Sequence, residues 1–149
     1  MGIQSGNFLY PVRLNTRAVR LSRSTPQPLT SGTITPITWD TEDFDNSLIV
    51  GSPSAAIVLP EAGLWAFVAF VAFQSNSTGL RRLLLDPNLS GTYPSIDSRP
   101  AVSGDNTHIT ISDTYLAAAG DTLRLNAHQN AGVSLNALAG AHFTAWLIA

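Results

Sequence analysis

Residues 63–73 read GLWAFVAFVAF, eleven positions without a polar side chain. As a helix this run would rise only about 16 Å, roughly half the hydrocarbon thickness of a bilayer, so it is too short to span a membrane. A buried helix would be apolar on every side, whereas Val and Phe alternate here with Ala in a way that suits a pleated strand. Gly63 before the run and the polar segment QSNSTG after it are typical strand ends. The run therefore predicts a strand over 63–74.

Both faces of this predicted strand are apolar, because successive side chains point to opposite sides of a strand. One face carries Trp65, Phe67, Ala69, Val71 and Phe73, and the other carries Leu64, Ala66, Val68, Phe70 and Ala72. In an antiparallel sandwich only one face of a sheet packs in the domain's own core. The second face needs a further layer, either an identical neighbouring chain or a loop or N-terminal segment of the same chain. Of these, the run favours an oligomer.

Pro and Gly residues at short intervals divide the rest of the chain into segments of strand length. We expect strands near 18–23, 33–39, 54–59, 63–74, 80–86, 107–115, 121–128 and 141–148. At 149 residues the chain fits one domain. About eight antiparallel strands with turns between them predict an all-β sandwich or jelly roll.

Four segments, in this order along the chain, resemble the jelly roll of the complement C1q and tumour necrosis factor (TNF) superfamily. They are ITWDTEDFDNS (37–47), IVLPEAGLWAF (57–67), AAGDTLRL (118–125) and HFTAWLI (142–148). The second is similar to the family's Pro and Gly pattern before a long apolar strand, and the last is similar to its closing strand. The resemblance covers residues 18–149. It implies a C1q/TNF-like antiparallel jelly-roll β-sandwich of about eight to ten strands that forms a homotrimer.

The superfamily's trimers pack around strands that correspond here to 63–74, 107–115 and 141–148. Carried over by position, the resemblance implies a trimer interface made of Ala66, Val68, Phe70, Thr110, His142 and Trp146. It implies that the protomer's own core contains Trp65, Phe67, Ile109, Phe143 and Leu147. This division agrees with the two faces that alternation alone assigns to the strand at 63–74.

Residues 1–17 precede the resemblance and form a separate N-terminal segment without helical or strand periodicity. They are either a loose terminus or an arm that docks on a neighbour or on a larger shell. Such an arm would dock through the apolar side chains of Phe8, Leu9 and Tyr10.

The chain also resembles small superfamily members of tailed bacteriophages, which serve as virion decoration or fibre-tip modules. This resemblance implies a virion location and a non-enzymatic structural role, in which a trimer stabilises the capsid by binding itself and the major capsid or other virion proteins. The alternative is a receptor-binding or fibre-tip trimer that recognises a host surface glycan or protein through outer loops at 87–106 and 128–140. A secreted bacterial ligand-binding module is a third possibility.

Charged side chains indicate neither a nucleic-acid surface nor a metal cage. The net charge is −2, and the arginines in TRAVRLSR do not share one strand face, which disfavours nucleic acid. Arg81, Arg82 and Arg99 are expected at exposed strand ends or in loops. The carboxylates of a predicted acidic loop are either solvated or, as the minor option, ligands for calcium; they belong to Asp40, Glu42, Asp43 and Asp45.

The remaining residues with catalytic or metal-binding chemistry do not form a recognisable site. His108, His128 and His142 lack metal-ligand spacing, and the chain has no Cys. The sequence also lacks a G-x-S-x-G motif and a phosphate-binding loop. We therefore expect no enzyme activity, no cofactor, no metal and no membrane insertion. By the family's register His142 is near the threefold axis, where a histidine cluster would respond to pH.

Overall fold

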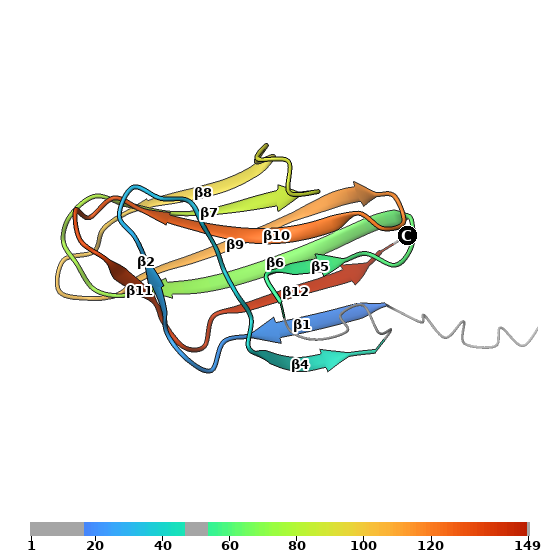
Figure 1. Cartoon of the computed structure of the whole chain (residues 1–149), viewed down its shortest axis with the longest axis horizontal. Coiled ribbons are helices and arrows are strands. Elements are labelled where there is room, and N and C mark those ends of the chain that lie inside the picture. The colour runs from blue at the N-terminus through green and yellow to red at the C-terminus, as the bar shows by residue number, and fades with distance from the viewer. Residues whose placement is uncertain (1–16, 47–53, 149) are drawn as a thin grey trace, which may run out of the picture.

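The computed structural model describes residues 17–46 and 54–148, which form twelve strands and, within these ranges, no helix (Figure 1). The strands are β1 (Ala18–Ser22), β2 (Gln27–Leu29), β3 (Thr35–Pro36), β4 (Thr41–Asp45), β5 (Ala56–Val58), β6 (Gly63–Phe73), β7 (Leu80–Pro87), β8 (Ser95–Pro100), β9 (Thr107–Ala117), β10 (Thr122–Gln129), β11 (Leu135–Ala137) and β12 (His142–Leu147). The predicted all-β jelly roll is confirmed.

The strands form two antiparallel sheets, called sheet A and sheet B here (Figure 1). Sheet A has the order β2-β11-β6-β12-β1-β4, and β9 also pairs with β6. Sheet B has the order β3-β10-β7-β8, and β5 also pairs with β10. The central strand of sheet A is β6, which has β9 on one side and β12 on the other. The run that is apolar on both faces is therefore the middle of a sheet.

The inward face of β6 contributes the centre of the hydrophobic core. Trp65, Phe67, Ala69, Val71 and Phe73 are all buried, as the alternation predicts. Phe143 on β12 is buried beside them, with its ring edge-on to Phe67 at a centroid distance of 6.1 Å. Of the other residues that the resemblance assigned to the core, Ile109 is buried and Leu147 packs against the core while half-buried.

Five short strands differ from what the sequence predicts. One of them is β2, which forms over Gln27–Leu29, where no strand was expected. The segments 87–106 and 128–140, expected as outer loops, contain β8 and β11, and the expected acidic loop contains β4. Conversely, only Thr35–Pro36 of the expected strand 33–39 is a strand. Both β4 and β8 lie at sheet edges and have one neighbouring strand, so main-chain pairing holds them without an apolar side-chain pattern. Such strands leave little periodic signal in a sequence.

Candidate subunit interface

The outer face of sheet A brings the six predicted interface residues together. The register aligns Thr110 on β9, Phe70 on β6 and His142 on β12 in one row across three strands. Two further rows run parallel to it: Ser112, Val68 and Thr144, and then Thr114, Ala66 and Trp146. All these side chains point away from the core, because the alternate residues of the same strands are those buried between the sheets.

An exposed apolar row continues this face toward one end of the sandwich. Leu64 pairs with Leu116, and the N–H of Ile148 donates to the carbonyl O of Leu64 at 2.7 Å. Leu116 is 77% exposed, the highest value among the large hydrophobic side chains of the described residues. Sequence reasoning missed Leu116, although its even number places it on the same strand face as Thr110. Large exposed apolar patches of this kind mark interaction surfaces.

Two histidine rings flank Phe70 on the outer face. The His142 ring stacks on the Phe70 ring with centroids 5.4 Å apart and an interplanar angle of 23°. The His108 ring meets the same ring edge-on, at 5.7 Å and 62°. His142 Nδ1 also lies 3.2 Å from the carbonyl O of Gly140. The sequence placed His142 at the interface but did not place His108 beside it, because the contact depends on how β9 is aligned with β6.

Carboxylates of the predicted acidic loop bind neighbouring strands of the fold. Asp43 accepts hydrogen bonds from Arg20 Nε at 3.0 Å and from the Ser22 hydroxyl at 2.8 Å, which ties β4 to β1. Asp40 accepts from the Ser24 N–H at 2.7 Å, and this bond is the main reason that the pKa of Asp40 is lowered. In the described ranges, no three His, Cys, Asp or Glu side chains gather where they could hold a metal ion.

The arginine prediction is wrong for Arg81. This side chain is completely buried, and its guanidinium donates to the carbonyl O atoms of Asn76, Thr78 and Leu80 at 2.9–3.2 Å. It points inward because it alternates in phase with the core residues of β7, and its long apolar stem extends the core. Burial lowers its pKa. Arg99 is exposed at the sheet edge, as expected.

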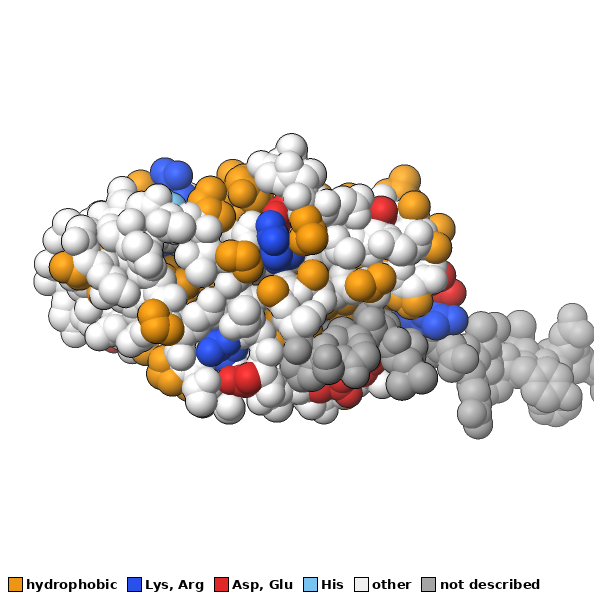
Figure 2. Space-filling model, viewed as in Figure 1, with side chains coloured by type: hydrophobic (Ala, Val, Ile, Leu, Met, Phe, Trp, Pro, Cys, Tyr) orange, Lys and Arg blue, Asp and Glu red, His pale blue; other side chains and the backbone are white. Residues whose placement is uncertain are grey.

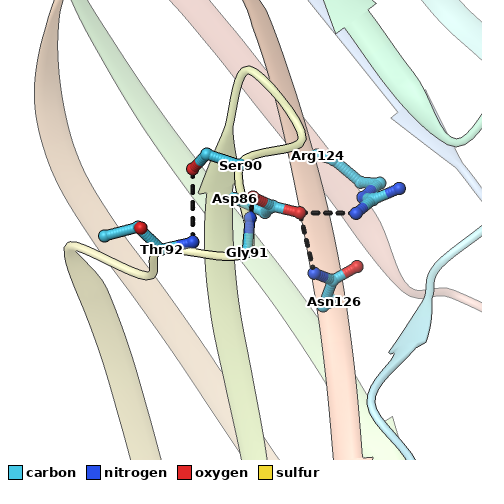
Figure 3. A network of polar contacts seen from close by, with 6 residues as sticks. All are labelled: Asp86, Ser90, Gly91, Thr92, Arg124 and Asn126. Atoms are coloured by element: carbon cyan, nitrogen blue, oxygen red, sulfur yellow. Dashed lines mark hydrogen bonds and ion pairs between the residues drawn. The ribbon is translucent and has the colours of Figure 1, made fainter.

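A buried polar network anchors the turn after β7 on the outer face of sheet B (Figure 3). The carboxylate of Asp86 is fully buried and pairs with Arg124 on the neighbouring strand β10. It also accepts from the Gly91 N–H at 3.0 Å and from Asn126 Nδ2 at 3.4 Å. Within the turn, the Thr92 N–H donates to Ser90 Oγ at 3.2 Å. Arg124, Asn126 and the Gly91 N–H all bind the Asp86 carboxylate, so the network has a structural role in holding the turn.

Replacing Asp86 with Ala should lower the free energy of unfolding by about 2–4 kcal/mol, because it leaves the Arg124 charge and the Gly91 N–H without their partner. Urea denaturation measures this loss. Asp97→Ala is the matched control, because it breaks the Asp97–Arg99 pair, in which the arginine side chain is 59% exposed. That change should cost less than about 1 kcal/mol. Equal losses in the two variants would contradict the assigned role of Asp86.

A shallow groove of about 430 Å³ lies between β8 and β9, where edges of the two sheets meet. Its wall includes Asp97, Arg99, Ser112 and Asp113. Asp113 accepts a hydrogen bond from Ser95, and this bond is the main cause of the lowered pKa of Asp113. The groove therefore presents hydroxyl, carboxylate and guanidinium groups to solvent beside the outer face of sheet A.

The face in view in Figure 2 has few charged side chains, and hydrophobic ones are scattered among uncharged polar ones.

The predicted arm residues Phe8, Leu9 and Tyr10 lie outside the described residues. Arg17, which the prediction counted with the arm, is attached to the domain. Its carbonyl O accepts from the Leu147 N–H at 2.9 Å, and its Nε lies 2.7 Å from a Glu61 carboxylate oxygen. The described residues contain no helix with the length and apolarity to cross a membrane.

Neither a protein-family model nor a curated protein sequence matches the chain, but solved structures do. The structure of murine APRIL at pH 5.0, a TNF family member, matches with a TM-score of 0.69 at 11% sequence identity, covering 89% of this chain and 99% of that chain. The globular domain of the zebrafish complement 1qA protein matches with a TM-score of 0.64 at 14% identity, covering 89% and 98%. The chain therefore has the C1q/TNF-like jelly-roll fold.

Proposed function

We propose that this chain is a non-enzymatic module that assembles as a homotrimer through the outer face of sheet A. The observation that carries the proposal is the apolar stripe of Ala66, Val68, Phe70 and Trp146 along the two central strands of that sheet. A single copy of the chain uses the opposite face of these strands as its core. A second apolar face in the middle of a sheet is explained if another copy covers it.

The threefold arrangement is supported by the fold, because the resemblance to the C1q/TNF superfamily implies trimers built around the same three strands. Covering the stripe stabilises the assembly by about 25 cal/mol per Å² of apolar surface buried, before the entropic cost of association is subtracted. The chain has no Cys, so no disulfide contributes to the assembly.

Within this class of module, we propose that the trimer decorates a bacteriophage capsid. Its action would be adhesive: the trimer binds a threefold or quasi-threefold point of the shell and stabilises the contacts there. The N-terminal arm, with Phe8, Leu9 and Tyr10, supplies an apolar segment for docking on the major capsid protein or another virion protein. The support for this setting is the resemblance of the sequence to small phage members of the superfamily.

The first experiment is light scattering on the purified protein at neutral pH. It should give about three times the 15.8 kDa mass of one chain, and a clean monomer would overturn the assembly. The second experiment mixes the trimer, and a variant lacking residues 1–14, with undecorated capsids and with host cells. Binding of the intact protein to capsids, and loss of that binding in the truncated variant, supports the decoration role.

Binding to cells without binding to capsids would instead favour the second candidate, a trimeric receptor-binding or fibre-tip module. One observation supports that alternative, namely the open groove between β8 and β9 with its mixture of hydroxyl and charged groups. Such groups suit a polar host ligand, for example a glycan.

A further inference from the structure

We propose that the assembly is acid-sensitive, and that His108 and His142 are the groups that sense pH. This inference rests on the proposed assembly through the outer face of sheet A. The two imidazole rings pack on the two sides of Phe70, so a partner that covers the Phe70 ring also covers both histidines.

In a separate protomer both histidines tolerate a positive charge. His108 is exposed and His142 is half-buried, so water solvates an imidazolium at either position. The Phe70 ring within 6 Å also favours a cation modestly through its π-electrons. Protonation therefore does not disturb the fold of the protomer.

In the assembly the same charge is costly, because covering the face removes water, and the carboxylates on the adjoining elements already accept hydrogen bonds within their own chain. On β1 and β4, Arg20 pairs with Asp43, whose second oxygen accepts from the Ser22 hydroxyl. In the loop before β9, Asp105 accepts from the Asn106 N–H. Thr110 is the row neighbour of Phe70 on β9, and β6 contributes Ala72 beside His108.

These surroundings determine the sign of the pH effect. Desolvation disfavours the charged form of an imidazole, so covering the two rings favours their neutral form. At acidic pH the exposed rings of the free protomer can take up protons that the covered rings of the assembly exclude. The assembly is therefore most stable when the histidines are neutral and weakens as the pH falls. Each of the three copies contributes two histidines, so the pH dependence is steep. The association constant changes by up to about tenfold per pH unit for each proton taken up.

The test is the mass in solution, measured by sedimentation or light scattering at about pH 7.5 and about pH 5. The wild-type protein should be trimeric at the higher pH and dissociate into folded protomers at the lower one, with an unchanged β-sheet circular dichroism spectrum. The double variant His108→Gln, His142→Gln should remain trimeric at both, because glutamine cannot be protonated in this range. His128→Gln is the matched control. His128 lies on β10 in sheet B, opposite Arg82 in the strand register, so this variant should behave as wild type.

The outcomes separate this inference from the proposed function. A wild-type protein that is monomeric at both pH values overturns both. A wild-type trimer that persists at about pH 5 overturns the acid sensitivity alone. Dissociation of the double variant together with the wild type assigns the effect to other groups and overturns the role of the two histidines.

If the double variant does not assemble at neutral pH, the pKa values of both histidines can be measured by NMR in two proteins. These are the wild-type trimer and a Trp146→Asn variant in protomer form, in which a neutral side chain is introduced two rows away from Phe70 and the surroundings of both histidines are kept. Lower values in the trimer support the proposal, and equal values or higher values in the trimer overturn it.

Discussion

Replacing Phe70 with Asp should convert the trimer into folded protomers. The new carboxylate stands at the centre of the outer face of sheet A, between His108 and His142, where a neighbour would have to cover it. Burying a carboxylate costs several kcal/mol in proteins, and the cost recurs in every copy, so association should weaken at least about a thousandfold. Light scattering should report the mass of a single chain, and circular dichroism should report an intact β-sheet spectrum.

The matched control for this change is Ile96→Asp. Ile96 is an apolar strand residue that is 54% exposed, but it lies on the outer face of sheet B, paired with Leu84. The same charge introduced there should leave the trimer mass unchanged. A Phe70→Asp protein that keeps the trimer mass, or an Ile96→Asp protein that loses it, would contradict the interface on sheet A.

Replacing Arg81 with Met should cause a large loss of protomer stability. Met retains much of the apolar stem, but it leaves the carbonyl O atoms of Asn76, Thr78 and Leu80 without their charged donor. Hydrogen bonds to charged groups contribute about 1.5–3 kcal/mol each, and the chain relaxes partly around the loss. We expect a decrease of about 3 kcal/mol in the free energy of unfolding, or roughly 6–12 °C in the melting temperature.

Arg99→Met is the control for this stability effect, since it removes an equally long arginine from an exposed position on β8. Its effect should stay below about 1 kcal/mol, because the ion pair that it breaks is exposed to solvent. Thermal unfolding of the two variants, compared with wild type, measures the difference. Similar melting temperatures would show that the buried guanidinium does not hold the turn at 76–79.

The strands with strong side-chain patterns could be predicted from the sequence. Alternation identified both faces of the run at 63–73, and the structure confirms which one is the core. The weakly patterned edge strands β4 and β8 could not be predicted, because main-chain hydrogen bonds to β1 and β7 create them. The same limit explains why the burial of Arg81 could not be predicted, because that burial depends on the carbonyl groups of a turn that folds over the side chain.

The two faces of β6 were determined by the sequence alone, because the direction of each side chain follows from a period of two within one strand. Which side chains meet across strands was decided only by the tertiary structure. The row of Thr110, Phe70 and His142, and the contact of His108 with Phe70, depend on the register between segments that are tens of residues apart. Register is a property of pairs of strands, and the pattern along a single strand does not contain it.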